Sequence, residues 1–208
     1  MCIRDSRTAM AVKKMNLRHI VITSVDRDDI KADFGATIWA ETIKQIHHHV
    51  PRCTVEVLTP DFQGDQSALK IVFNAKPEIF SHNVECVERI SKKVRAQSVW
   101  SRSLDVLKQS VINGLRTKTG MMVGLGESNN EVIETMKKME RIVDQQYKND
   151  VHYKKMSPSY DGIAFKAACS LAIKGKYQPS GYTEPILHLS LIHISEPTRP
   201  LYISYAVF

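Results

Sequence analysis

The chain has 208 residues, 43% of them hydrophobic and 25% charged, as is usual for one globular domain with a buried core. No apolar run approaches the roughly 20 residues that cross a bilayer, and no signal peptide opens the chain, so we expect no membrane partner and a cytoplasmic location. The formal net charge is +7, but Lys and Arg are scattered and no aromatic residues interleave with them. This pattern argues against nucleic acid as a partner and leaves an acidic protein or an anionic cofactor.

Both ends of the chain resemble translated sequencing adaptor. MCIRDS, residues 1–6, fits the mosaic end used in transposon-based library preparation, and LSLIHISEPTRP, residues 189–200, fits its reverse complement running into adaptor. The closing ISYAVF fits further adaptor in the same frame. We therefore expect residues 1–6 and 189–208 to be artefact, and residues 7–145 to carry the natural domain.

Strand-like and helix-like segments alternate from Leu17 onward. β-branched apolar runs predict strands at 19–25, 54–60, 79–85 and 117–127, and apolar residues at helical spacing predict helices at 37–50, 65–75, up to Val94, 101–115 and 129–145. Asp65 and Ser101 are the expected N-caps of two of these helices. This alternation predicts an α/β fold with a parallel sheet, and the absence of an opening glycine-rich turn favours an incomplete (β/α) TIM-type barrel over a Rossmann fold.

Each predicted strand becomes abruptly polar or glycine-rich where it ends, in TSVDRDD, TPDFQGD, HNVE and GLGE. In a barrel these ends would face one mouth, where chemistry collects. The first of them runs into five charged residues in six, Asp26 to Lys31. This run lacks the spacing of an EF-hand metal loop, and it also fits an ion-pair network that closes a turn.

GMMVGLGE, residues 120–127, lets the backbone approach a flat or phosphate-like ligand at Gly124 and Gly126, and the helix that follows offers free N–H groups. A strand-to-helix turn that needs positive φ is the alternative. In HNVE, Asn83 and Glu85 would face the same side of a strand and could hold ribose hydroxyls or an ammonium group, although an exposed strand end fits as well. The His47–His49 run is expected to be a solvated helix end without ligand function.

Together these segments are similar to the lipoyl synthases, a family of radical S-adenosylmethionine enzymes. The resemblance covers about residues 9–140 and is carried by AVKKMNLRHIVITSVDRDDI, VEVLTPDFQGD, FSHNVECVERISKKVRAQSVWSRSLDVL and TKTGMMVGLGESNNEVIETM. TSVDRDD and KTGMMVGLGE, in this order and separation, are its most specific parts. GMMVGLGE also fits the GxIxGxxE strand pattern of radical S-adenosylmethionine barrels, with Met122 in the Ile place.

The resemblance implies a partial barrel that cleaves S-adenosylmethionine reductively. A 5′-deoxyadenosyl radical would then remove hydrogens from a protein-bound octanoyl chain, and sulfur would be inserted at two carbons. The partner implied is an octanoylated, acidic lipoyl-carrier domain, and the location is cytoplasmic, or mitochondrial in a eukaryote.

The resemblance also implies which residues bind the cofactor. Ser24 and Asp26 would lie beside its methionine moiety, and Asn83 and Glu85 would reach its ribose and amino acid ends. Arg102 would pair with the carboxylate. Lys118 and the backbone from Gly124 to Gly126 would flank the adenosine. No catalytic residue and no metal ligand is assigned.

The chain departs from the family in two places. The CxxxCxxC loop expected upstream of Met10 is absent, as are the cysteines of a second, sulfur-donating cluster, so the two [4Fe-4S] clusters of the parent enzyme lack ligands here and we expect this chain alone to be inactive. The four cysteines, Cys2, Cys53, Cys86 and Cys169, fit reduced, buried thiols.

The second departure begins near Asp144. From there to residue 188 the family pattern survives at most in GKYQPS, and residues 146–188 fit a frame slip, a chimeric join or real divergence equally well. Two rival functions stay open for the whole chain. One is a fragment of another sulfur-inserting radical enzyme related to biotin synthase, which shares the glycine-rich strand but not TSVDRDD. The other is a non-catalytic barrel fragment that binds a nucleotide-like ligand or an acidic carrier protein.

Overall fold

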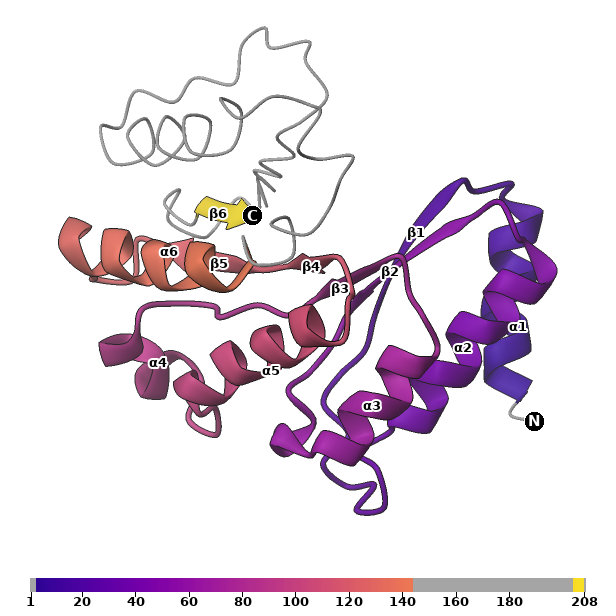
Figure 1. Cartoon of the computed structure of the whole chain (residues 1–208), viewed down its shortest axis with the longest axis horizontal. Helices are drawn as coiled ribbons and strands as arrows, with labels where there is room; N and C mark the ends of the chain where they lie inside the picture. The colour runs from indigo at the N-terminus through magenta and orange to yellow at the C-terminus, as the bar shows by residue number, and fades with distance from the viewer. Residues whose placement is uncertain (1–2, 144–203, 208) are drawn as a thin grey trace, which may run out of the picture. The chain divides into compact units, whose positions relative to one another are not determined.

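A computed structural model describes residues 3–143 and 204–207 of the chain, and Figure 1 labels its elements. In chain order these are α1 (Ile3–Lys14), β1 (His19–Thr23), α2 (Ala36–His49), β2 (Thr54–Leu58), the 3-10 turn η1 (Phe62–Gly64), α3 (Gln66–Asn74), β3 (Ile79–Ser81), α4 (Glu88–Val94), α5 (Trp100–Ile112), β4 (Thr117–Lys118), β5 (Gly120–Val123), α6 (Asn129–Val143) and β6 (Ser204–Val207). They fall into two compact units, Met1–Val84 with Val99–Thr119, and Glu85–Ser98 with Gly120–Phe208.

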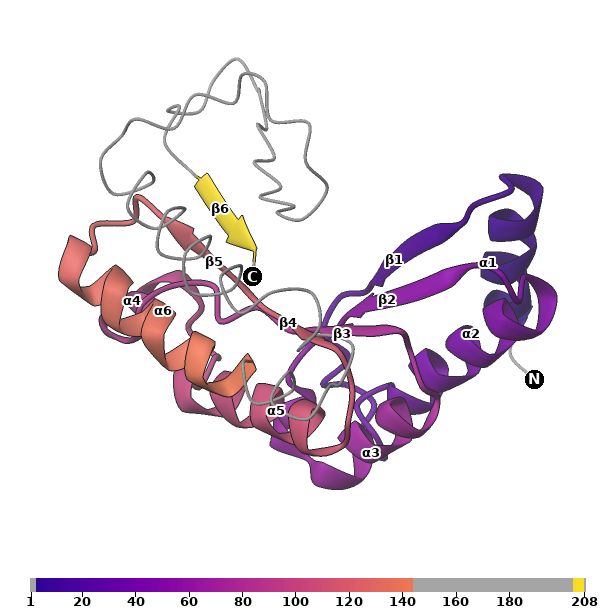
Figure 2. The same ribbon diagram turned by 45° about the horizontal axis from the view of Figure 1, so that its top comes forward.

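The first unit contains a four-stranded sheet in the order β1-β2-β3-β4, with every neighbouring pair parallel. Parallel neighbours need crossover connections, and α2, α3 and α5 supply them. Figure 2 shows α2 and α3 lying along one face of the sheet. The predicted α/β class and parallel sheet are therefore confirmed.

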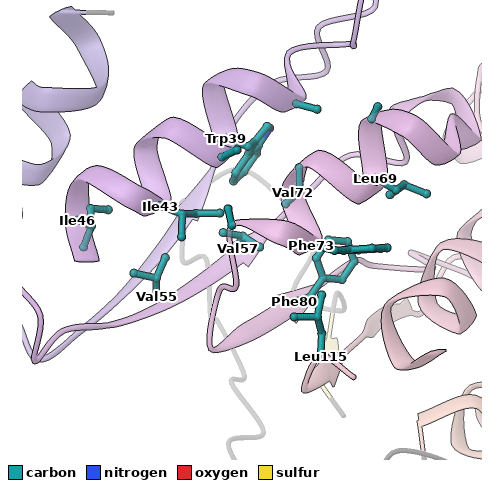
Figure 3. Packing of buried hydrophobic residues seen from close by; sticks show 14 of the residues in the cluster. Trp39, Ile43, Ile46, Val55, Val57, Leu69, Val72, Phe73, Phe80 and Leu115 are labelled. Carbon is teal, nitrogen blue, oxygen red and sulfur yellow. The ribbon is translucent and has the colours of Figure 1, made fainter. Parts of the chain in front are cut away.

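The core of the first unit lies between that face and the helices. Val55 and Val57 on β2 and Phe80 on β3 are fully buried, because alternate strand residues point to the same side and meet α2 and α3 (Figure 3). Phe73 of α3 packs edge to face on Phe80, with ring centroids 5.0 Å apart. Ile43 of α2 is also fully buried in this cluster.

The second unit contains α4, β5, α6 and β6. β5 pairs antiparallel with β6, and an isolated parallel bridge joins Glu85 to Met121 of β5. The helix predicted from apolar spacing at 129–145 is present as α6, and four of its apolar residues at that spacing are buried, namely Val132, Met136, Met139 and Val143.

Several sequence-based boundaries need correction. The strand expected at 79–85 ends at Ser81, and the strand expected at 117–127 is divided into β4 and β5, which belong to different sheets. Asp65 caps α3 as predicted, accepting a 2.8 Å hydrogen bond from the Ala68 N–H. Ser101 does not cap α5, because the helix already begins at the buried Trp100.

The sequence divided the chain into adaptor-like ends, a domain at 7–145 and a separate segment at 146–188, and the structure describes only part of these ranges. Residues 146–188 lie outside the described part of the chain, as do residues 189–203, so the departure that begins near Asp144 falls outside the described residues. Four of the six residues at the N-terminus that resemble adaptor belong to α1, and β6 lies within the C-terminal segment that does so. None of the helices in the described ranges is both long enough and apolar enough to cross a membrane.

Candidate functional site

Four of the expected cofactor-binding residues lie at one edge of the sheet in the first unit. Ser24 and Asp26 follow β1, Asn83 follows β3, and Lys118 is the last residue of β4. The strands are parallel, so their carboxyl ends share this edge, which is where α/β folds bind ligands. Ser24 and Asp26 are exposed and Asn83 is half-buried, so their polar atoms lie within reach of a ligand.

The charged run after β1 contains an ion pair, and Asp33, which follows the run, has separate backbone partners. Arg27 forms a two-point ion pair with Asp29, with Nε–Oδ1 and Nη2–Oδ2 distances of 2.8 and 2.7 Å. The hydrogen bond from Arg27 lowers the pKa of the Asp29 carboxyl. Asp33 accepts hydrogen bonds from the N–H groups of Gly35 and Thr37, at 2.9 and 2.8 Å, at the start of α2. An ion pair within the turn, one of the two interpretations open from the sequence, is thus present.

Asp28 contacts a different part of the chain. Its Oδ2 accepts a 2.6 Å hydrogen bond from Nε2 of Gln63, in the turn after β2. In that same turn, Asp61 caps η1 by accepting a 3.0 Å bond from the Gln63 N–H. Two neighbouring strand ends are therefore joined by a side-chain hydrogen bond.

Arg102, in the first turn of α5, lies against this turn. Its Nη1 donates to Asp61 Oδ2 at 3.0 Å and to Gln63 Oε1 at 3.1 Å, and its side chain is 23% exposed. The sequence suggested that Arg102 binds a cofactor carboxylate, whereas here its guanidinium binds the acid and amide of the turn.

Lys118 also has a partner within the first unit. Its Nζ donates to Oε1 of Glu56 at 2.9 Å, from the next strand but one, and His19 Nε2 lies 3.7 Å from the other carboxylate oxygen. Glu56 alternates with the core residues Val55 and Val57, so it points to the face of the sheet opposite α2 and α3. Only 5% of Glu56 is exposed, and the ammonium group compensates its buried charge.

At the amino edge of the same sheet, polar groups support the fold. Glu78 Oε2 accepts a 2.7 Å bond from the Val55 N–H and lies 3.2 Å from Nε2 of His47, in the last turn of α2. Burial works against ionisation of Glu78, yet these hydrogen bonds keep its pKa below the ordinary value. His47, which was expected to belong to a solvated helix end, is instead half-buried and in contact with Glu78.

The glycine loop of the second unit is the strand-to-helix turn with positive φ that the sequence left open as one of two interpretations. Gly124 and Gly126 both have φ of +98°, so the left-handed backbone explains why glycine occurs there. The Glu127 carboxylate accepts hydrogen bonds from the N–H groups of Gly124 and Leu125, the latter at 2.9 Å. Two N–H groups of the loop that was expected to let a ligand approach are therefore bound to a carboxylate of the chain itself.

The start of α6 is satisfied in a similar way. Glu131 accepts a 2.8 Å bond from the Ser128 N–H, and Ser128 Oγ lies 3.3 Å from the Glu131 N–H, which is the reciprocal pattern of a capping box. Arg89 of α4 binds both carboxylate oxygens of Glu131, at 2.7 and 3.0 Å. Arg89 and Ser128 together lower the pKa of Glu131 from 4.5 to about 2. The expected free N–H groups at this helix start are thus not all available, because the N–H of Ser128 has a partner.

Glu85 belongs to the second unit, and the predicted alternation with Asn83 is wrong there. The strand that should have placed both side chains on one side ends at Ser81, and Glu85 has φ of +70°. Its backbone binds β5 instead, with the Glu85 carbonyl accepting from the Met122 N–H at 2.6 Å. A non-glycine residue with positive φ stores strain that the surrounding contacts must offset.

The described cysteines do not fit an iron–sulfur cluster. Cys53 and Cys86 are buried thiols outside any disulfide, and burial raises the pKa of both, whereas a cluster is held by a set of several thiolates that converge on it. In the part of the chain that the structure covers, no three or more His, Cys, Asp or Glu side chains gather as a metal site would require. Cys2 and Cys169 lie outside the described residues.

Comparison with known proteins defines the class. Residues 6–139, more than half of the chain, match the radical SAM superfamily, and the chain therefore belongs to that superfamily. Within it, the chain is similar to proteins named lipoyl synthase, which confirms the resemblance expected from the sequence.

Three relatives illustrate this similarity. The chain is 52% identical over 133 residues to the lipoyl synthase of Rubrobacter xylanophilus, 50% over 132 residues to that of Karelsulcia muelleri, and 47% over 131 residues to the mitochondrial lipoyl synthase of Nematostella vectensis. The matches cover 63%, 63% and 62% of this chain and 41%, 46% and 45% of the relatives. The chain thus spans less than half the length of these curated relatives.

The hydrogen bonds of Asp28, Gln63, Glu56 and Glu127 were not expected from the sequence. The SxxE spacing of Ser128 and Glu131 is a readable capping signal. The contacts of Gln63 and Glu56 join residues 35 and 62 positions apart, which no local pattern reveals.

Proposed function

We propose that this chain is the central part of a lipoyl synthase, the enzyme that inserts two sulfurs into a protein-bound octanoyl chain. The observation that carries the proposal is the identity of about half to lipoyl synthases from two bacteria and an animal across the whole matched region. Four adjacent parallel strands in chain order are also what an arc of a (β/α) TIM-type barrel would contribute. We expect the whole protein to complete that barrel with strands that precede and follow this arc.

The carboxyl edge of the first unit is the proposed place for S-adenosylmethionine. Ser24 and Asp26 after β1 and Asn83 after β3 offer a hydroxyl, a carboxylate and an amide at one edge of one sheet. This set suits a zwitterionic nucleoside, whose ammonium and hydroxyl groups need acceptors and whose carboxylate needs donors. When bound in the parent enzyme, S-adenosylmethionine would supply the radical for hydrogen abstraction after reduction by one electron from a [4Fe-4S] cluster, and these residues would bind and orient it.

Glu85 and the backbone at Gly124 and Gly126 remain proposed cofactor contacts in the second unit. Arg102 and Lys118, which the sequence also suggested as contacts, already pair with Asp61 and Glu56, so we propose that they fix these two acids and do not touch the cofactor. The two [4Fe-4S] clusters need thiolates that Cys53 and Cys86 do not provide, so no cluster is proposed on the described residues. We propose that sulfur insertion does not occur in this chain alone.

The proposed protein partner is an octanoylated lipoyl-carrier domain. A net charge of +7 suits docking on an acidic domain, because opposite charges steer association. Titrating an octanoylated and an unmodified acidic carrier into the chain tests this directly, and equal affinity for both would count against recognition of the acyl group.

Calorimetric titration of S-adenosylmethionine into the full chain tests the cofactor site. Asp26→Asn should weaken binding about tenfold, the loss expected for one charge-assisted hydrogen bond. Glu41→Gln, an exposed carboxylate on α2 that pairs with Lys44, is the matched control and should leave affinity unchanged. Equal affinity in the wild-type and Asp26→Asn chains would remove Asp26 from the site, and an absence of binding in the wild type would contradict the proposal.

A further inference from the structure

The turn after β2 has a backbone that needs outside support. Phe62, Gln63 and Gly64 have φ of +47°, +55° and +75°, so three consecutive residues adopt the left-handed conformation, two of them without being glycine. Such a conformation persists only where neighbouring contacts determine it.

Two contacts hold this turn from opposite sides. The Phe62 side chain is 1% exposed and belongs to the core cluster of the first unit. On the other side, the Arg102 stem packs so closely that a Cβ at Gly64 would lie 3.2 Å from its Cγ, and the guanidinium binds Asp61. Arg102 and Phe62 thus fix the turn before any ligand arrives.

The Gln63 amide links this fixed turn to the loop after β1 by hydrogen bonds. Its Oε1 accepts from Arg102, and its Nε2 donates to Asp28 at 2.6 Å. The orientation of the amide is unambiguous, because a guanidinium only donates and a carboxylate only accepts. Asp28 lies two residues beyond Asp26 and four beyond Ser24, so a restraint at Asp28 shortens the segment of that loop that is free to move.

We propose that Gln63 is a positioning residue, which holds the loop after β1 in the conformation that presents Ser24 and Asp26 to the ligand. The inference rests on the proposed function, because the ligand is S-adenosylmethionine bound at the carboxyl edge. Gln63 acts through Asp28 and does not itself touch the ligand. Pre-ordering the loop reduces the entropy lost on binding, so breaking this link weakens affinity without removing a ligand contact.

Gln63→Glu removes the hydrogen bond to Asp28 and keeps the one from Arg102. The introduced carboxylate has the same length and accepts from Arg102, but it cannot donate to Asp28 and it repels that carboxylate. Adding Asp28→Asn restores a hydrogen bond with its direction reversed, from the new amide to the new carboxylate. Gln66→Glu, an exposed glutamine in the first turn of α3, is the matched control.

Two measurements on the full chain are combined. Without ligand, hydrogen exchange at residues 24–29 should become about tenfold faster in Gln63→Glu, and it should return to within about threefold of wild type in the double variant. Exchange at Gly64 should stay unchanged in both variants, and Gln66→Glu should exchange as wild type does at residues 24–29. Affinity for S-adenosylmethionine should fall about tenfold in Gln63→Glu and recover in the double variant.

The results separate two failures. If wild type does not bind S-adenosylmethionine, the proposed function fails and the ligand part of this inference fails with it. If wild type binds but Gln63→Glu exchanges normally at residues 24–29, or exchanges faster and still binds with wild-type affinity, the positioning role alone is overturned. Failure of Asp28→Asn to rescue either quantity would also overturn it.

Discussion

The loop after β1 and the glycine loop after β5 were expected to serve one ligand, yet they are held in different ways. The first depends on a partner 35 residues away, through the hydrogen bond from Gln63 to Asp28. The second is closed by its own neighbour, because Glu127 accepts from the N–H groups of Gly124 and Leu125. One loop is ordered by tertiary structure, whereas the other is ordered by residues within three positions.

A glycine-rich turn is therefore not by itself an anion site. Left-handed glycines point several N–H groups to one side, which favours a negative charge there. At Gly124 that negative charge is Glu127, so an external phosphate would have to displace a carboxylate. The loop after β1, in contrast, keeps Ser24 and Asp26 exposed. It is therefore a better candidate for ligand contact than the glycine loop.

The largest effect is expected where a long-range contact compensates a buried charge. Lys118→Met removes the ammonium group that binds Glu56, a residue that is 5% exposed. Of the contacts that the structure shows for this carboxylate, the one to His19 at 3.7 Å then remains. The substitution should lower the free energy of unfolding by about 2–3 kcal/mol. Urea unfolding measures this. Lys108→Met, whose partner Asp105 is exposed, should change stability by less than about 0.5 kcal/mol.

A second substitution completes that test. Adding Glu56→Gln to Lys118→Met removes the uncompensated charge, so the double variant should be more stable than the Lys118→Met variant. If the double variant is equally or less stable, Lys118 supports the sheet by packing of its stem, and the ion pair does not stabilise this face.

A smaller effect is expected at the glycine loop. Glu127→Ala removes the carboxylate that accepts hydrogen bonds from two N–H groups of the loop. Water can replace this carboxylate because the loop is exposed, so the free energy of local opening should fall by only about 1 kcal/mol. Exchange of the Gly124 and Leu125 amides should become about fivefold faster. Glu134→Ala, on the exposed side of α6, should leave both amides unchanged. Unchanged exchange in Glu127→Ala would show that β5 pairing, rather than Glu127, holds the loop.

The smallest effect is a pH dependence at the start of α6. The pKa of Glu131 is lowered from 4.5 to about 2, first by the hydrogen bond from Arg89 and then by those from Ser128. The folded state therefore favours the ionised carboxylate, and this contribution to stability is complete above about pH 4.5 and is lost as the pH falls towards 2. Carboxyl carbon shifts measured against pH should give a midpoint near 2 for Glu131.

An Arg89→Gln variant separates the effect of a long-range partner of Glu131 from that of a local one. Arg89 lies 42 residues away from Glu131 in the sequence, whereas Ser128 lies three residues away. The Glu131 midpoint should move back towards 4.5 in this variant. An unchanged midpoint would mean that the local Ser128 contacts alone hold the carboxylate ionised, and that this helix start needs no long-range partner.

Local patterns predicted much of the fold. β-branched runs located the strands, helical spacing located α2, α3, α5 and α6, and Asp65 was identified as a cap because its bond to Ala68 spans three residues. The division of the fourth strand into β4 and β5 was not predictable, because GMMV is equally apolar in either sheet. The start of α5 at Trp100 was missed because a buried aromatic residue took precedence over a serine cap.

The candidate site was predicted less completely. The positions of Ser24, Asp26 and Asn83 followed from strand ends in a parallel sheet. The roles of Gln63 and Glu56 did not, because both depend on which strands become neighbours and on pairs more than thirty residues apart.

Hydrogen exchange of the full chain, measured with and without S-adenosylmethionine, shows whether the ligand binds at the carboxyl edge of the sheet. Binding at the carboxyl edge should slow exchange at residues 24–28 and at Asn83, and leave the amino edge at Val55 and Glu78 unchanged. Protection confined to the amino edge, or the same exchange everywhere at saturating S-adenosylmethionine, would contradict the account.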